Sequence, residues 1–280
     1  GDVYKRQYVT TSASFDFPVM RNVVPEGDVF GVGVSGLTDA SGDAALKLNY
    51  GSLSASYHKS LDETGYNTLG IGFQGTYTSV TIDQSKLIFE DMLRQNGFTG
   101  TTSDILTNGN NQNYFDVNAG LLFSGSTNGY NNYYIGASMY HLNRPKLNFK
   151  DKNWYLTSRV AFHAGGSFPM TDAITLHASA IEQIQNKANE TVLGAALGFN
   201  LNNNNEISQP TTLFAGSWIR FADAAVPYVG LEFGGLRIGA TYDINISSLK
   251  AATASRGGME FSLIYIKQPP SPTGIPCPKF

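Results

Sequence analysis

The sequence predicts an all-β fold, a transmembrane up-and-down antiparallel β-barrel of about fourteen strands in the intact protein and about thirteen in this chain. Apolar and polar side chains alternate in runs of about ten residues, as in strands with two different faces. No segment approaches the roughly 18 uninterrupted apolar residues of a transmembrane helix. Charged residues make up 15% of the chain, below the roughly 25% of soluble domains.

The clearest alternation spans residues 68–78. Leu69, Ile71, Phe73 and Tyr77 fall on one face of this segment, whereas the other face carries only Thr, Gly and Gln. A strand of about 9–11 residues with one apolar and one polar face suits a barrel with lipid outside and a polar lumen. A soluble β-sandwich also alternates and remains an alternative, although it favours fewer and shorter strands.

Thirteen segments carry this pattern, and short connections rich in Gly, Asn, Asp and Pro separate most of them. Adjacent strands joined by such turns are antiparallel. The longest segment is expected to contain a bulge at Gly51. The predicted strands are residues 8–17, 28–36, 44–60, 66–80, 112–124, 131–142, 158–168, 172–184, 189–200, 211–221, 224–233, 235–245 and 258–267.

An odd number of strands conflicts with bacterial single-chain barrels, in which the number is even. We therefore expect one further strand on the amino-terminal side, where residues 1–7 read as non-native sequence. The barrel is expected over residues 8–267, followed by a Pro-rich tail over 268–280. If the carboxyl end is periplasmic, the Asn-rich connection 201–209 also lies on the periplasmic side. Three long connections then lie on the extracellular side, namely residues 81–111, 143–157 and 246–257.

Composition and motifs exclude several functions. A net charge of −3 without a basic run argues against a nucleic-acid partner. A single cysteine, Cys277, allows neither an intrachain disulfide nor a cysteine metal cluster. The chain has no Gly-x-Ser-x-Gly, no His-Glu-x-x-His and no phosphate-binding glycine loop, so we predict no enzyme activity and no cofactor.

Charged residues within the strands fall on the face expected to line the lumen. Glu232 and Arg237 stand opposite each other across a predicted two-residue turn. Opposite charges on neighbouring strands attract, so we expect ion pairs that brace the lumen. A selectivity or substrate site is the alternative, and ion pairs in contact with water contribute little individually. The candidates are Arg220, Glu232, Arg237, Asp243 and Glu260.

Two features leave alternatives open. His163 and His177 become cross-strand neighbours if the hairpin at 169–172 is tight. They would then be a polar pair or part of a metal site, but no third ligand lies at a suitable spacing, so no metal site is predicted. The strand that contains Trp218 can be threaded in two ways, which differ in whether this side chain faces outside.

The connection after residue 80 contains a segment with helical spacing, residues 83–97. It is interpreted as a short helix that plugs the mouth of the barrel, or as a docking surface. Because loops on a rigid scaffold commonly carry binding sites, this segment is the predicted contact with a partner. The helically spaced side chains are Leu87, Phe89, Met92 and Leu93.

Four stretches resemble the PorP/SprF family of outer-membrane proteins, which is linked to type IX secretion and gliding in Bacteroidetes. They read SLSASYHKSL with NTLGIGFQGTYTSVTID, IGATYDINISSL, GGMEFSLIYIK and the terminal PCPKF. The likeness extends over nearly all of residues 8–280. The chain departs from the family in lacking the amino-terminal portion and in having Lys279 where Arg is expected.

The resemblance implies a bacterial outer-membrane barrel that anchors or helps to localise a type IX-secreted surface protein by binding its carboxy-terminal sorting domain. The implied partners are outer-membrane lipid, the exported protein and other components of the secretion system. The family has no catalytic residues to transfer. A porin or a transporter of hydrophobic compounds is the alternative function, and an outer-membrane enzyme would need a Ser/His/acid cluster that the sequence does not display.

Overall fold

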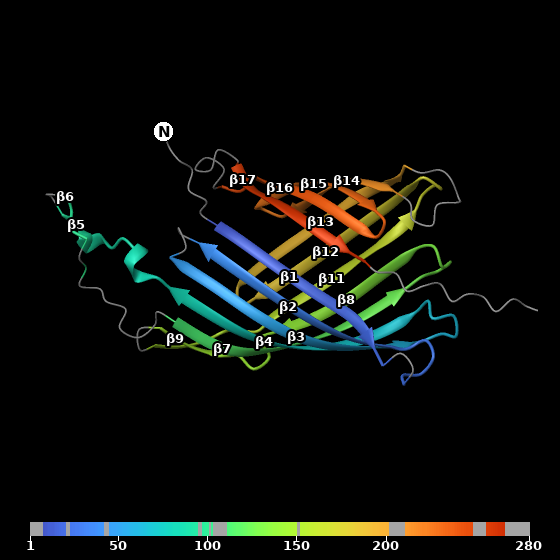
Figure 1. Cartoon of the computed structure of the whole chain (residues 1–280), viewed down its shortest axis with the longest axis horizontal. Coiled ribbons are helices and arrows are strands. Elements are labelled where there is room, and N and C mark those ends of the chain that lie inside the picture. Colours follow the sequence, from blue (N-terminus) through green and yellow to red (C-terminus); the bar gives the residue numbers. More distant parts are fainter. Residues whose placement is uncertain are drawn as a thin grey trace, which may run out of the picture. The chain divides into compact units, whose positions relative to one another are not determined.

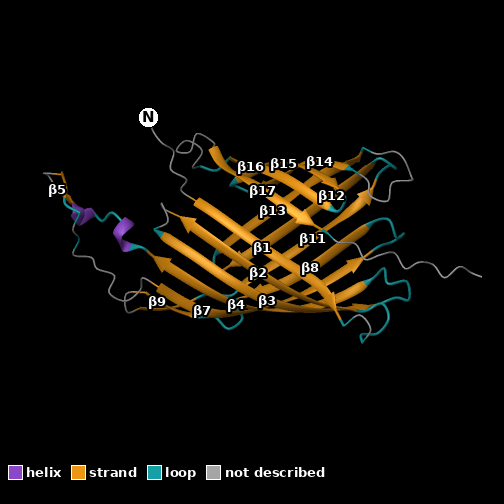
Figure 2. Ribbon diagram, viewed as in Figure 1, coloured by secondary structure: helices purple, strands orange, loops and turns teal. Residues whose placement is uncertain are grey.

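The structure is a computed structural model that describes residues 8–20, 23–41, 45–94, 97–100, 102, 111–149, 152–201, 211–248 and 256–266. Thirteen strands form one sheet in the order β1-β2-β3-β4-β7-β8-β11-β12-β13-β14-β15-β16-β17. Each long strand therefore neighbours the next long strand along the chain (Figures 1 and 2). The predicted all-β, up-and-down antiparallel class is confirmed, whereas closure of the meander into a barrel stays a prediction.

All thirteen predicted segments coincide with strands of this sheet, although the ends differ by a few residues. Among the described residues, no helix has the length and apolar character needed to cross a membrane. The strands are β1 (Tyr8–Val19), β2 (Val29–Ser41), β3 (Leu46–Ser60), β4 (Thr68–Ile82), β7 (Asn111–Gly125), β8 (Asn132–Tyr140), β11 (Arg159–Pro169), β12 (Ile174–Gln185), β13 (Ala188–Asn200), β14 (Thr212–Arg220), β15 (Ala224–Phe233), β16 (Leu236–Asn245) and β17 (Arg256–Tyr265).

In the described parts of the connections there are four short strands and two short helices. β5 (Leu93–Arg94) pairs with β6 (Gly97–Phe98), and β9 (Lys146–Phe149) pairs with β10 (Lys152–Tyr155). The 3-10 helices are η1 (Gln84–Lys86) and η2 (Glu90–Met92). The predicted non-native start, the connection 202–210 and the Pro-rich tail with Cys277 lie outside the described residues.

The chain divides into two compact units. Unit 1 comprises Gly1–Gly125, Tyr134–Phe162 and Gln183–Asn189. Unit 2 comprises Ser126–Tyr133, His163–Glu182 and Glu190–Phe280.

In unit 1, β1, β2, β3, β4 and β7 form a continuous antiparallel ladder. The bulge predicted at Gly51 is absent, because Gly51 pairs in unbroken register with Gly36 of β2 and Tyr77 of β4. All fifteen residues of β3 have partners on β4. No residue of β3 is therefore unpaired, as a bulge would require. The segment is long because β3 itself is a long, regular strand.

In unit 2, β13 to β17 form a second run of consecutive antiparallel pairs. The turn between β15 and β16 consists of Gly234 and Gly235, whose φ angles are +57° and +80°. Two consecutive positive φ angles are what a two-residue type I′ hairpin requires, and glycine adopts them without strain. Here the ladder does contain an irregularity, a register shift between Tyr242 and Ile244 in the β16–β17 pair.

Burial along the strands is inverted relative to a soluble protein. On β4, Phe73 and Tyr77 are each 56% exposed, whereas Thr76 and Thr78 are buried. The large exposed side chains continue along the same face of the neighbouring strands, with Leu53 at 71% on β3. A soluble sandwich would bury these side chains, so this pattern favours a sheet whose apolar face meets lipid. The buried polar residues are Asp28, Ser52, Thr76, Thr78, Asp116 and Asn118.

The two faces of β3 should respond differently to a charge. Leu53 lies mid-strand and points outward, whereas its neighbour Ser54 is half-buried on the other face. We expect Leu53→Arg to lower the free energy of unfolding by about 2–4 kcal/mol, because a cation would have to enter hydrocarbon. Ser54→Arg is the matched control and should cost clearly less. Urea unfolding in lipid vesicles measures both, and equal losses would contradict a lipid-facing β3.

Candidate functional site

The predicted residues Arg237 and Glu232 stand opposite each other on β16 and β15. Nη2 of Arg237 lies 2.5 Å from Oε2 of Glu232, and Nε donates to the same oxygen at 2.6 Å. The guanidinium also lies over the ring of Phe214, 4.4 Å from its centroid. Because Phe214 is buried, the ion pair and the ring form one packed contact on the polar face of unit 2.

Arg220, Asp243 and Glu260 are the other predicted lumen residues. Nη1 of Arg220, at the end of β14, lies 2.9 Å from Oδ2 of Asp223 and 3.5 Å from Oδ2 of Asp243. The shorter of these contacts was not predicted, although its sequence signal is visible as an i,i+3 pair across the β14–β15 turn. Glu260 lies on β17 opposite Thr241 of β16, and its side chain is exposed.

The structure does not bring His163 and His177 together. Nδ1 of His177 lies 2.7 Å from Oγ of Ser167, four residues further along β11 than His163. That pairing depended on a tight hairpin at 169–172. The prediction of this hairpin is wrong, because β11 ends at Pro169 and β12 begins only at Ile174. Within the described part of the chain, no group of three or more His, Cys, Asp or Glu could hold a metal ion.

The side chain of Trp218 lies on the polar face of β14. This observation decides between the two orientations of the strand that the sequence left open. Nε1 of Trp218 donates to Oγ of Ser179 at 2.9 Å, and its ring packs edge-on against Tyr228 with centroids 5.8 Å apart. Gly194 on the neighbouring strand makes the room, since a Cβ there would lie 2.6 Å from Cγ of Trp218. The side chains that face outward on this strand are Leu213 and Ile219.

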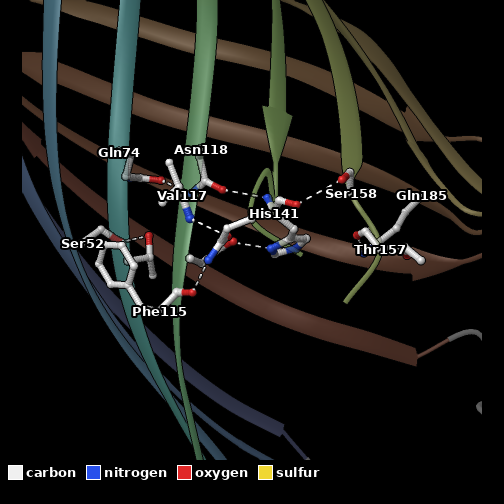
Figure 3. A network of polar contacts seen from close by, with 12 residues as sticks. Ser52, Gln74, Phe115, Val117, Asn118, His141, Thr157, Ser158 and Gln185 are labelled. Carbon is white, nitrogen blue, oxygen red and sulfur yellow. Dashed lines mark hydrogen bonds and ion pairs between the residues drawn. The ribbon is translucent and has the colours of Figure 1, made fainter. Parts of the chain in front are cut away.

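Unit 1 holds a polar network across β3, β4 and β7 (Figure 3). The hydroxyls of Ser52 and Thr76 are 2.9 Å apart, and both residues are buried. Nδ2 of Asn118 donates to Oε1 of Gln74 at 3.0 Å. These contacts join directly paired positions on neighbouring strands, so polar side chains replace the apolar packing of an ordinary core.

The network extends from β7 to His141, the first residue after β8. The N–H of His141 donates to Oδ1 of Asn118 at 3.0 Å, and Nδ1 of its ring lies 2.7 Å from Oδ2 of Asp116. Its carbonyl accepts from Oγ of Ser158 at 3.1 Å. The serine hydroxyl is thus directed to the main chain and is not held by the imidazole, so this His–Asp pair does not activate it as a nucleophile.

Asn143 fixes the beginning of the β8–β11 connection against β7. Its Oδ1 accepts from the N–H of Val117 at 3.1 Å, and its Nδ2 donates to the carbonyl of Phe115 at 2.7 Å. The N–H of Leu142 donates to the carbonyl of Val117 at 2.9 Å. The sequence reading missed His141 and Asn143 as site candidates, since residue 141 fell at the end of the predicted strand 131–142, Asn143 fell in a connection, and neither lies at a motif spacing.

The described residues between positions 83 and 102 (83–94, 97–100 and 102) do not form the predicted helix. They form the two 3-10 turns and the β5–β6 pair, because Leu87 and Phe89 have extended backbone angles and interrupt any helix. Of the predicted contact residues, Met92 is buried, Leu87 and Phe89 are half-buried, and Leu93 is 64% exposed. Two exposed apolar side chains that were not predicted accompany Leu93 in this segment, namely Ile88 and Phe98.

Comparison with known proteins decides the family. The family described as type IX secretion system membrane protein PorP/SprF matches residues 3–265. The chain belongs to the PorP/SprF family. No curated protein matches the sequence. Among solved structures, this PorP/SprF chain is similar to BamA from Haemophilus ducreyi lacking POTRA domains 1–3, with 9% identity and a TM-score of 0.46. The similarity covers 91% of this chain, which spans 60% of that protein's length.

Family membership confirms the resemblance carried by the four sequence stretches. The PorP/SprF protein is a membrane component of the type IX secretion system, and the predicted location in the bacterial outer membrane is confirmed.

A second polar cluster in unit 1 of the PorP/SprF chain lies where β2 begins and β3 ends. Asp28, just before β2, accepts from the hydroxyl of Tyr57 and from the N–H of Ser60, the latter at 2.8 Å. These hydrogen bonds, the hydroxyl first, hold the pKa of Asp28 below its ordinary value despite burial. Lys59 acts in the same direction from 3.9 Å.

Asn143→Ala should loosen the β8–β11 connection of the PorP/SprF protein. The change removes two hydrogen bonds to β7, each worth about 1 kcal/mol. We expect faster cleavage between residues 141 and 158 in limited proteolysis, with the strand content by circular dichroism unchanged. Asn143→Asp, which keeps the acceptor for Val117, should give an intermediate rate. Identical cleavage of all three proteins would show that Asn143 does not hold the connection.

Acid should weaken the fold partly through Asp28. Because its pKa is lowered in the folded state, its contribution to stability is present above the ordinary carboxyl pKa and is lost as the pH falls through the lowered value. Asp28→Asn should be less stable at neutral pH and should lose less stability on acidification. Urea midpoints over a pH series measure this, with Asp172→Asn in an exposed turn as control. An Asp28→Asn curve parallel to the parent would refute the assignment.

Proposed function

We propose that the protein is a non-enzymatic outer-membrane barrel that anchors or helps to localise a type IX-secreted surface protein by binding its sorting domain. The single observation that carries this proposal is the family match over residues 3–265. The inverted burial of the strands supports a membrane-embedded body whose polar strand faces turn away from lipid, as in a barrel with a polar lumen. Arg220, Glu232, Arg237, Asp243 and Glu260 are proposed to brace it.

The body of the proposed barrel is suited to support rather than to chemistry. Its polar side chains are engaged with one another, as the Arg237–Glu232 pair and the Asn118–Gln74 bond illustrate. Such contacts rigidify a scaffold without presenting an activated nucleophile. Partner recognition would then belong to the connections, as in other proteins that carry binding loops on rigid scaffolds.

The proposed contact surface is the β5–β6 segment with its exposed apolar side chains. Ile88, Leu93 and Phe98 are 70%, 64% and 60% exposed. Met92 in the same segment is buried, and its carbonyl accepts from the N–H of Thr99 at 2.9 Å, which ties η2 to the residue after β6. An exposed apolar cluster on a polar connection is typical of a site that a partner covers. Of the four predicted contact residues, Leu93 is therefore the one available to a partner.

Removing this cluster should weaken partner retention without affecting insertion. We expect the triple change Ile88→Ser, Leu93→Ser and Phe98→Ser to reduce the amount of a large secreted protein that copurifies from native membranes in mild detergent. Loss of three apolar contacts should cost about tenfold or more in affinity. Heat-modifiable migration of the variant should match that of the parent, because the strands are untouched.

Phe221→Ser is the control, since Phe221 is an exposed aromatic residue of another turn. It should leave retention unchanged. Parent-like retention by the triple variant would remove the contact surface from the proposal. Recovery of the parent barrel alone, without any secreted protein, would overturn the anchoring function itself.

A further inference from the structure

The β9–β10 pair combines exposed basic and aromatic side chains. Arg144 and Lys146 are exposed, and Trp154 and Tyr155 are 60% and 59% exposed. In the register, Tyr155 stands opposite Lys146, and Trp154 stands opposite Leu147. Because directly opposed residues share a face, one face carries Lys146 with Tyr155 and the other carries Leu147 with Trp154. We call β9, β10 and the preceding Arg144 the basic ribbon.

The polar network holds the basic ribbon in place. His141 and Arg144 both have positive φ angles, +59° and +44°, and the N–H of Arg144 donates to the carbonyl of His141 at 3.0 Å. At the other end, the N–H of Leu156 donates to the carbonyl of the buried Pro145 at 2.9 Å. The ribbon is therefore a supported element, positioned through His141 and Asn143, rather than a free loop.

The ribbon begins where the exposed apolar face of unit 1 ends. Asn143 bonds the carbonyl of Phe115, whose side chain is 56% exposed on the same face as Tyr77 on β4. Leu142, next to Asn143, is also exposed. Trp and Tyr side chains concentrate at the boundary between hydrocarbon and headgroups. Trp154 and Tyr155 thus have the chemistry expected at the rim of a lipid-facing surface.

The charge of the ribbon differs from that of the rest of the chain. Four of the nineteen basic residues fall between positions 144 and 152, together with one acidic residue, in a chain of net charge −3. The contact segment proposed above carries acidic residues, such as Glu90 and Asp91. A basic patch beside interfacial aromatic residues is complementary to phosphate groups at a membrane surface.

We propose that the basic ribbon binds the phosphate groups of lipid A in the outer leaflet of the membrane. In this arrangement Arg144 and Lys146 bind phosphate, while Trp154 and Tyr155 lie at the level of the sugar headgroup. The site goes beyond the anchoring function, because it concerns the lipid around the barrel and not the exported partner.

The two tryptophans of the chain allow a direct test. Trp218→Phe removes the tryptophan that bonds Ser179 on the polar face and leaves Trp154 as the only indole. The folded full chain in neutral-detergent micelles is titrated with diphosphoryl lipid A while the emission of Trp154 is recorded. We expect a blue shift that saturates with lipid A. Arg144→Glu and Lys146→Glu together should raise the midpoint about 25-fold, at about fivefold for each lost cation.

Lys59→Gln is the control, because Lys59 is an exposed cation at the other end of the strands, level with Leu69 of β4 and Phe123 of β7. It should leave the midpoint within about twofold. Phe123 lies eight residues along β7 from Phe115, roughly 26 Å at the rise of a strand, and a charge more than a Debye length from the ribbon is screened. An unchanged midpoint in the Arg144/Lys146 variant would overturn the proposal. So would an equal response to phosphatidylcholine, to phosphatidylglycerol or to inorganic phosphate, or a Trp154 shift that appears only when the exported protein is added.

Discussion

The backbone hydrogen-bond ladder is the constraint on which the rest of the structure depends. A strand in hydrocarbon finds no water, so every N–H and C=O on it needs a partner from a neighbouring strand. The uninterrupted register of β3 satisfies this requirement over all fifteen of its residues toward β4 and over residues 46–58 toward β2. Once the ladder is satisfied, alternation alone decides which side chains meet lipid and which are buried with one another.

The two units fill their polar faces by different means. Unit 1 uses hydroxyl and amide contacts such as Ser52–Thr76 and Asn118–Gln74, which need only short side chains. Unit 2 places the long Arg237 side chain over Phe214 and pairs its charge with Glu232. An ion pair carries a desolvation cost, which hydrogen bonds and packing against an aromatic ring help to offset. Either solution avoids the large apolar core of a soluble protein.

Much of the fold could be predicted from sequence because the side-chain period of a strand is local. All thirteen long strands were found in this way, as was the Glu232–Arg237 juxtaposition, which depends only on a two-residue turn. The rest depended on information that is not local. Leu87, Phe89 and Met92 have helical spacing, but the backbone is extended at Leu87 and Phe89 and only two short 3-10 turns form. His141 bonds side-chain atoms of β7 and Asn143 bonds backbone atoms of β7, in each case more than twenty residues away, so no spacing marks them.

The meander also has a consequence for how the chain folds. Most long strands pair with a neighbour that follows after a few residues, so closing each hairpin costs little chain entropy and occurs in microseconds. The largest exception is the junction of β4 with β7, because residues 83–110 intervene, compared with residues 141–158 between β8 and β11. Its closure carries the largest entropic cost among the unit 1 pairs, and we expect it to form late. The early hairpins would be held together before this longest loop closes.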